Sequence, residues 1–219
     1  MKKIFFTRKL IKESEEFAAS LFKVKFNIDD ILLSKEEIII QSNDCDGIIS
    51  TITEVFDEDI IFKLSERIKI ISNFGVGISN IDINAAKKRN IIVTNTPDVL
   101  TDATAEIAML IILGAARRAT EGIKYARNKN WRWSSSFLIG KELNNARLGI
   151  LGMGRIGRAV ANRARSFGMK IHYHNRSRLN KNLEKNATYH KSLESLLSIS
   201  DFFSINCPAT KETKHIINE

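Results

Sequence analysis

Short apolar runs and amphipathic segments alternate along the first hundred residues of this chain. Runs rich in β-branched and aromatic residues, typical of buried strands, occur at 3–7 (KIFFT), 46–52 (DGIISTI), 68–74 (IKIISNF) and 91–97 (IIVTNTP). Helical patterns lie at 13–22 and 81–90, and EEIIIQS at 36–42 fits either a strand or the end of a helix. This alternation of strand and helix predicts an α/β unit with a parallel sheet.

A long helical pattern follows from residue 102 to residue 130, soon after Pro97. Asp102 is placed to cap the first turn of this helix, where the negative charge of Glu106 is also favourable. Between 105 and 116 the pattern is apolar on nearly every face. This predicts a helix that is buried between domains or between subunits.

The second half of the chain repeats the alternation in a more specific order. Strand and helix patterns follow one another at 147–152, 155–167, 170–175, 192–199 and 202–206, which is a βαβαβ unit. A Rossmann domain contains two such halves, so we expect a Rossmann-type dinucleotide-binding domain that is incomplete. We therefore divide the chain into a first domain, residues 1–99, and a second domain, residues 100–219.

The turn between the first of these strands and its helix carries Gly152, Gly154 and Gly157 in the run LGILGMGRIG. Glycines at this spacing let the strand turn sharply, let a pyrophosphate approach bare backbone and let the helix pack close to the sheet. The first N–H groups of the helix then face the phosphates. A glycine turn in an unrelated α/β protein is the alternative, but the strand KIHYHN, which ends about 20 residues further on, favours a dinucleotide site.

The end of that second strand bears on the choice of cofactor. An acidic residue there would bind the ribose 2′-hydroxyl of NAD and repel the 2′-phosphate of NADP. This chain has Asn175 instead, followed by Arg176, Ser177 and Arg178. Two cations and a hydroxyl can make charge-assisted hydrogen bonds to a phosphate. The sequence therefore predicts a preference for NADP(H) over NAD(H), the alternative being that both arginines are solvated residues of a generally basic chain.

Composition excludes several other classes of protein. The chain has 219 residues, 43% of them hydrophobic, and a net charge of +9, but its lysines and arginines are scattered, so we expect no nucleic-acid partner; a steep salt dependence of binding would reveal one. The apolar part of MKKIFFTRK is too short for a signal peptide, and IAMLIILGAA at 107–116 is too short to span a bilayer. Cys45 and Cys207 give no disulfide framework or zinc site, which indicates a cytoplasmic protein without a metal.

Several motifs in order carry a resemblance to a known family. They are NFGVGISNID at 73–82, NTPDVLTDATAEIAM at 95–109, the loop with Trp131 and Trp133, LGILGMGRIG at 148–157, FGMKIHYHNRSR at 167–178 and INCPATKETKHIIN at 205–218. With these the chain resembles the D-isomer-specific 2-hydroxyacid dehydrogenases, and among them the glyoxylate and hydroxypyruvate reductases. The resemblance implies a flavodoxin-like substrate domain followed by a Rossmann-type cofactor domain, with reaction in the cleft between them.

The implied activity is hydride transfer between NAD(P)H and a small 2-oxo acid such as glyoxylate or hydroxypyruvate, giving a D-2-hydroxy acid. The resemblance implies that the backbone of Val76 and Gly77 binds the substrate carboxylate, although a tight turn would also explain Gly77. The expected cofactor-binding residues are Thr104, Gly152, Met153, Gly154, Arg155, Ile156, Gly157, Asn175, Arg176, Ser177, Arg178, Cys207, Pro208 and Thr213. The family's catalytic arginine, glutamate and histidine are expected beyond Glu219, so residues 1–219 alone are expected to be inactive.

The histidines of the chain do not match the family's acid. His172 and His174 share one face of a strand, but a metal pair there lacks further ligands. His190 and His215 are expected at the surface, at the edges of elements. Cys207 has no base nearby that would make it a nucleophile.

Two classes of function remain. The first is an oxidoreductase polypeptide, and the second is a non-catalytic nucleotide-sensing or protein-interaction module without acid–base residues. Whether the coding sequence continues past Glu219 would discriminate them. The apolar helix at 103–119 fits a homodimer formed through the cofactor domain. Where the family commonly has a glycine in the turn before the dinucleotide strand, this chain has LNNAR at 143–147, and the turn can survive because Asn145 tolerates a left-handed conformation.

Overall fold

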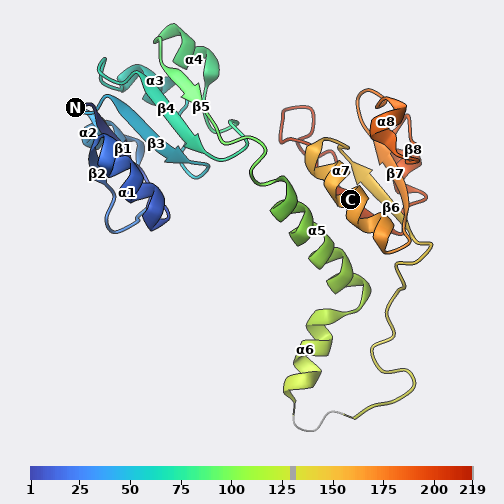
Figure 1. Cartoon of the computed structure of the whole chain (residues 1–219). Coiled ribbons are helices and arrows are strands. Elements are labelled where there is room, and N and C mark those ends of the chain that lie inside the picture. Colours follow the sequence, from blue (N-terminus) through green and yellow to red (C-terminus); the bar gives the residue numbers. More distant parts are fainter. Residues whose placement is uncertain (129–131, 219) are drawn as a thin grey trace. The chain divides into compact units, whose positions relative to one another are not determined.

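The chain divides into two compact units, Met1–Asp98 and Val99–Glu219. The computed structural model describes residues 1–128 and 132–218, and Figure 1 shows the elements of both units. Each unit has its own parallel sheet and its own helices, so each is described by itself.

The first unit is built on a parallel sheet of five strands over the described residues. The strands are β1 (Lys3–Phe6), β2 (Lys23–Phe26), β3 (Gly47–Thr51), β4 (Ile70–Phe74) and β5 (Ile92–Thr94). Their order in the sheet is β2-β1-β3-β4-β5, and every pair is parallel. This is the strand order of flavodoxin-like folds. The predicted α/β class with a parallel sheet is confirmed.

Four helices accompany this sheet: α1 (Lys12–Leu21), α2 (Lys35–Ser42), α3 (Glu58–Lys63) and α4 (Ile83–Lys88). The segment at 36–42, which fitted a strand or a helix end, is the helix α2. Ser34 caps it reciprocally, because the Ser34 hydroxyl accepts from the Glu37 N–H over 3.2 Å and the Glu37 carboxylate accepts from the Ser34 N–H over 2.8 Å. Such a capping box satisfies two N–H groups that the helix itself cannot bond.

Phe5, Ile48 and Ile71, from the three central strands β1, β3 and β4, form the middle of the first core. All three side chains are at most 1% exposed, and they pack with Phe56 and with Ile60 of α3. The consecutive apolar residues of these strands are buried because helices cover the sheet, as is usual for parallel sheets.

The long helix expected over 102–130 is in fact two helices, α5 (Thr101–Ala116) and α6 (Ala119–Arg127). They are separated at Arg118, whose φ of +52° lies in the left-handed region, where an α-helix cannot continue. The predicted cap is also wrong: the N-cap residue is Leu100, and Asp102 lies in the first turn and pairs with Arg163 over 3.0 Å. The expected end of the helix at 129–130, together with Trp131, lies outside the described residues.

The second unit has a four-stranded parallel sheet over its described residues, in the order β8-β7-β6-β9. Its remaining elements are β6 (Arg147–Leu151), α7 (Arg155–Ser166), β7 (Lys170–His174), α8 (Lys181–Glu184), β8 (Thr188–Tyr189), α9 (Leu193–Leu197) and β9 (Phe202–Ile205). In chain order this is 3-2-1-4, the beginning of the Rossmann order 3-2-1-4-5-6. Asn145, a residue type that tolerates the left-handed conformation, adopts it here with φ of +61°.

Helix α5 packs against α7 and contributes one face to the second core. Ala105, Met109 and Ile112 are at most 7% exposed, whereas Ile107, Leu110 and Ile111 are exposed. Within the second unit the helix is therefore buried on one face only, and its burial between domains or between subunits stays a prediction. Among the described residues no helix is long and apolar enough to cross a membrane.

Candidate cofactor site

The glycine turn after β6 is built from close backbone contacts. Gly152 has φ of +92°, and a Cβ placed on it would lie 2.5 Å from the backbone nitrogen of Cys207. A Cβ on Gly157 would lie 2.3 Å from the carbonyl oxygen of Gly152. A side chain at Gly152 would push the turn away from the residues that follow β9, and a side chain at Gly157 would push α7 away from the turn. Real Cβ atoms do not approach other atoms so closely.

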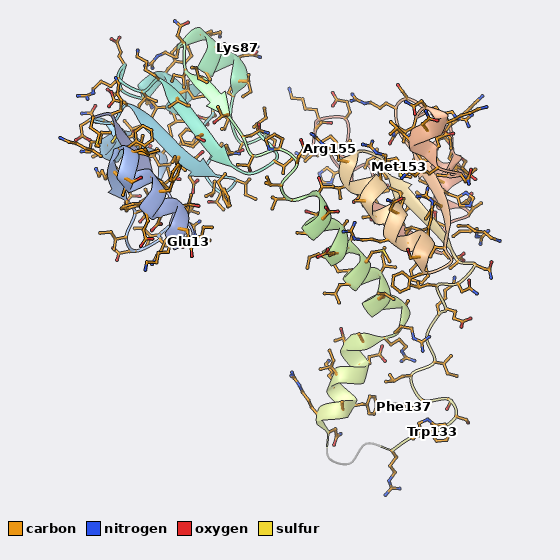
Figure 2. The ribbon with its side chains drawn as sticks, in the orientation of Figure 1. Glu13, Lys87, Trp133, Phe137, Met153 and Arg155 are labelled. Atoms are coloured by element: carbon orange, nitrogen blue, oxygen red, sulfur yellow. The ribbon has the colours of Figure 1, made fainter. Side chains whose placement is uncertain are left out.

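Gly154 differs from the other two glycines. It is the N-cap residue of α7, and a Cβ built on it would meet no atom within 4 Å. Within residues 1–128 and 132–218 no side chain caps this helix, and its first N–H groups have no intrahelical partner. Bare backbone, open space and a helix N-terminus together make a place where a pyrophosphate group can approach. Figure 2 labels Met153 and Arg155, which flank this point.

The end of β7 is hydrogen-bonded to the glycine turn. The backbone N–H of Met153 donates to Asn175 Oδ1 over 2.7 Å. The Tyr189 hydroxyl donates to the backbone oxygen of Asn175 over 3.4 Å. NAD-specific sites carry a carboxylate at this position, whereas this chain has Asn175. Hydrogen bonds hold both the side-chain oxygen and the backbone oxygen of Asn175.

A pocket of about 400 Å³ lies where the carboxyl ends of β6, β7 and β9 meet. It brings together eight of the expected cofactor-binding residues: Gly152, Gly154, Asn175, Arg176, Ser177, Cys207, Pro208 and Thr213. These come from three strand ends that are far apart in sequence, and ligands of open α/β sheets bind at such an edge. The residues present fit an adenine dinucleotide: a glycine-lined backbone, a helix N-terminus and polar groups at the second strand.

Two charges of opposite sign line this pocket, Arg176 and Glu212. The Thr210 hydroxyl, and to a lesser degree the charge of Arg176, hold the pKa of Glu212 below its usual range. Arg176 therefore places a positive charge in the pocket, and this charge interacts with the carboxylate of Glu212. Ser177 follows directly and also lines the pocket.

Arg178 is in a different situation from Arg176. Its Nε and one terminal nitrogen donate to the two carboxylate oxygens of Glu184, over 2.8 and 3.1 Å. Arg178 is not among the residues that line the pocket. The sequence-based expectation that both arginines face the phosphate is thus not supported for Arg178, because a nearly buried carboxylate holds its guanidinium.

Five other expected cofactor residues are not among those that line the pocket. The Met153 side chain is fully buried, Ile156 packs against the core, and Gly157 provides the close contact with Gly152. Arg155 is the first residue of α7. Thr104 lies exposed on α5.

The expected carboxylate-binding loop follows β4 in the first unit. Asn73 Nδ2 donates to the backbone oxygen of Gly77 over 2.9 Å, and Asn95 Nδ2 donates to that of Val76 over 2.8 Å. A Cβ on Gly77 would meet nothing within 4 Å. Two asparagines therefore fix the carbonyl groups of this loop, and the space around Gly77 is open.

His172, His174 and His190 form a small cluster, and His174 also lines the pocket beside the glycine turn. His172 Nδ1 lies 3.0 Å from His190 Nε2, and His174 Nδ1 lies 2.9 Å from the backbone oxygen of His190. Burial, together with the charge of His190, lowers the pKa of His172. No group of three or more metal-ligating side chains occurs within residues 1–128 and 132–218.

Sequence reasoning missed part of the pocket lining, namely Leu151, His174, Asn206, Thr210, Glu212 and Ile216. Three of these, Leu151, His174 and Asn206, end or directly follow the parallel strands β6, β7 and β9. Because the carboxyl ends of parallel strands meet at one edge, the last residue of each strand was a usable signal. Thr210 and Glu212 lie in turns after β9, for which the sequence offers no periodic pattern.

Comparison with known proteins agrees with this geometry. Residues 109–219 match the family model described as D-isomer specific 2-hydroxyacid dehydrogenase, NAD binding domain. The chain is 41% identical to the glycerate dehydrogenase of Hyphomicrobium methylovorum, over 100% of this chain and 69% of that protein. It is 38% identical to the glyoxylate reductase of Thermococcus kodakarensis, over 99% of this chain and 66% of that protein.

Solved structures give the same result. A glyoxylate reductase from Paecilomyes thermophila is similar with a TM-score of 0.84 and 34% identity, over 99% of this chain and 68% of that one. The chain spans about two thirds of the length of these relatives. With a matching family model, matching relatives and a matching fold, this chain belongs to the D-isomer-specific 2-hydroxyacid dehydrogenase family.

Proposed function

We propose that the protein is an oxidoreductase that transfers a hydride between NADPH and a small 2-oxo acid, giving a D-2-hydroxy acid. The observation that carries this proposal is the pocket at the strand ends, where a glycine turn, the uncapped N-terminus of α7 and the Asn175–Ser177 segment line one space. Family membership supplies the reaction class.

In this proposal the residues of the second unit bind and orient the cofactor. Gly152 and Gly154 let the pyrophosphate reach backbone N–H groups, and the N-terminus of α7 stabilises its negative charge. The nicotinamide group, when bound, supplies the hydride. The protein contributes position and electrostatics, and these decide which carbon atom receives the hydride.

The first unit is proposed to bind the substrate. Val76 and Gly77 would offer backbone N–H groups to the carboxylate of the 2-oxo acid, since their carbonyl groups are already held by Asn95 and Asn73. Glyoxylate and hydroxypyruvate are the candidates, because relatives of this chain are named glyoxylate reductase and glycerate dehydrogenase.

NADP(H) is proposed over NAD(H). Arg176 and Ser177 line the pocket next to Asn175, and none of these three side chains repels a 2′-phosphate. A carboxylate at Asn175 would favour the free ribose of NAD instead. Glu212, in the same pocket, works against the phosphate, so the proposed preference rests on Arg176.

A homodimer is proposed through the exposed apolar face of α5. This face consists of Ile107, Leu110 and Ile111, each more than half exposed. Burying side chains of this size stabilises an interface by about 1.5–3 kcal/mol each. We propose no nucleic-acid or membrane partner, and a cytoplasmic location, with which the free thiols of Cys45 and Cys207 are compatible.

Direct titration of the purified protein tests the proposal. The arginine, glutamate and histidine that the family uses match no position of this sequence, so binding is a more direct measurement than turnover. We expect NADPH fluorescence to rise on binding, with competition by NADP⁺. Reduction of glyoxylate or hydroxypyruvate is then assayed with the full product of the coding sequence. Absence of dinucleotide binding would contradict the proposal, and binding without any turnover would favour the nucleotide-sensing alternative.

A further inference from the structure

Glu184 is a nearly buried carboxylate at the end of the short helix α8. Its residue is 5% exposed, yet it belongs neither to the pocket lining nor to the glycine turn. A buried charge is costly unless it is paired and hydrogen-bonded. The partners of Glu184 therefore indicate what this carboxylate does.

These partners all come from β7 or from the segment that follows it. Arg178 binds both carboxylate oxygens, and the Tyr173 hydroxyl donates to Glu184 Oε1 over 2.7 Å. The same hydroxyl accepts from the backbone N–H of Leu179 over 3.0 Å. Burial raises the pKa of Tyr173 to about 12, so its hydroxyl stays a proton donor to the carboxylate at neutral pH.

The segment from Asn175 to Leu179 is consequently held at both ends. At its start, Asn175 accepts from the Met153 N–H. At its end, Leu179 donates to the Tyr173 hydroxyl, and Arg178 is bound by Glu184. The two residues between these anchors, Arg176 and Ser177, both line the cofactor pocket. The anchors thus fix the backbone that presents them.

We propose that Glu184, Tyr173 and Arg178 form a clamp that positions Arg176 and Ser177 for the 2′-phosphate of NADPH, so that Arg178 is a positioning residue and not a phosphate ligand. This proposal rests on the proposed NADP(H) preference. It assigns different roles to two arginines that are only two positions apart. Without the clamp, residues 175–179 would lose conformational freedom when the cofactor binds, and this entropic cost would lower the affinity for NADPH.

The charges of the clamp support this division of roles. Glu184 neutralises Arg178, and the paired guanidinium together with the Tyr173 hydroxyl holds the pKa of Glu184 below its usual range. Arg176 has a different environment, because it lies in the pocket in the field of Glu212. A ligand phosphate therefore meets the charge of Arg176 there, whereas that of Arg178 is already compensated.

The experiment compares two small ligands by calorimetry on the purified protein. Adenosine 2′,5′-bisphosphate carries the 2′-phosphate, and AMP lacks it. Tyr173→Phe removes one hydroxyl, and with it the acceptor of Leu179 and a donor to Glu184. We expect it to weaken bisphosphate binding about fivefold, which corresponds to one hydrogen bond of ~1 kcal/mol. AMP affinity should stay within about twofold, because Met153 still holds Asn175.

Two further variants keep the test decisive. Ile171→Val shortens a buried side chain of the same strand, away from the segment, and should leave the ratio of the two affinities unchanged even if it lowers stability. Arg178→Lys keeps a positive partner for Glu184 and should reduce bisphosphate affinity less than Tyr173→Phe does. A large loss in Arg178→Lys with none in Tyr173→Phe would overturn the clamp and make Arg178 a direct phosphate ligand.

The outcome also separates this inference from the proposed cofactor preference. Equal affinity of the unmodified protein for bisphosphate and AMP would overturn the NADP(H) preference and the clamp together. A clear preference for bisphosphate that survives Tyr173→Phe would overturn the clamp alone. A preference that is lost in Tyr173→Phe and kept in Ile171→Val would support both.

Discussion

The Met153 N–H donates to the side-chain oxygen of Asn175 over 2.7 Å, which joins the glycine turn after β6 to the end of β7. This hydrogen bond fixes the orientation of the Asn175 side-chain amide, with its oxygen directed at the Met153 N–H. A carboxylate at this position could accept the same hydrogen bond, so its charge can be introduced without changing the geometry. The relationship therefore offers a clean way to test cofactor choice.

Asn175→Asp is expected to weaken NADPH binding at least about tenfold, or ~1.4 kcal/mol, because a carboxylate next to the 2′-phosphate adds like-charge repulsion. NADH binding should stay the same or improve, since a carboxylate can bind the ribose hydroxyl groups. Fluorescence titration with both cofactors measures the change. Asn162→Asp is the control, as it adds the same charge to the exposed side of α7. An unchanged NADPH affinity in Asn175→Asp would contradict the assignment of this subsite.

Gly152 and Gly154 are expected to respond differently to a single methyl group. Gly152→Ala places a Cβ 2.5 Å from Cys207 N at φ of +92°, so it should lower the free energy of unfolding by about 1–3 kcal/mol. Gly154→Ala should leave that free energy within about 0.5 kcal/mol, because a Cβ there meets nothing, yet reduce dinucleotide affinity. Chemical denaturation and NADPH titration of both variants measure this. Full NADPH affinity in a folded Gly154→Ala variant would show that no phosphate approaches this glycine.

Ile111→Glu should dissociate the proposed dimer. Ile111 is 65% exposed on α5, and a charge buried in an apolar interface is unfavourable unless it is paired. Sedimentation velocity at micromolar concentration should show a dimer for the unmodified protein and a monomer for the variant. Ile31→Glu, at an exposed isoleucine of the first unit, is the matched control and should remain dimeric. A monomeric unmodified protein would refute the proposed interface.

Stability at acid pH should depend on Asp201. Arg147 first, and Lys141 second, hold the pKa of this carboxyl well below its usual range. A carboxyl with a lowered pKa in the folded state stabilises the fold above the unfolded-state pKa of about 3.9, and this stabilisation is lost as pH falls through the folded-state pKa. Asp201→Asn should therefore be less stable than the unmodified protein at pH 7, with a smaller difference at pH 3.

Urea denaturation at the two pH values measures this dependence. Asp102→Asn serves for comparison, because the Asp102 side chain is 82% exposed and its pairing with Arg163 is a surface ion pair of small effect. Equal destabilisation by Asp201→Asn at pH 7 and pH 3 would mean that its hydrogen bonds matter without its charge.

Strands with several consecutive apolar residues could be predicted from the sequence, including the edge strands β5 and β9, whereas the edge strands β2 and β8 could not. The strand β2, KVKF, alternates with lysine and is only partly buried, and β8 has two residues. The break between α5 and α6 was missed because Arg118, and not glycine or proline, adopts the left-handed conformation there. At this break the Lys141 N–H donates to the carbonyl oxygen of Ala116 over 2.8 Å, a long-range contact that no local pattern of residues reveals.

The pocket could be predicted only in part for a similar reason. Gly152 and Asn175 have fixed spacings from strands, and such spacings can be read along the chain. Arg176 and Arg178 follow the same strand and have the same chemistry. What separates them is Glu184, which lies on a helix that the sequence pattern did not reveal. An ion pair between two segments leaves no periodic pattern in the amino-acid sequence, so it could not be predicted.

The position of β9 in its sheet has a consequence for synthesis of the chain. β6 pairs with β7 on one edge and β9 on the other, and the contact between Arg147 and Asp201 spans 54 residues. At about 5–20 residues per second, a ribosome needs roughly 3–10 s to make that stretch. During this interval one edge of β6, flanked by apolar residues, has no strand to pair with and is open to other chains. Slow translation between residues 151 and 202 should therefore increase aggregation of the nascent protein, and the exposure ends only when β9 has been made and pairs with β6.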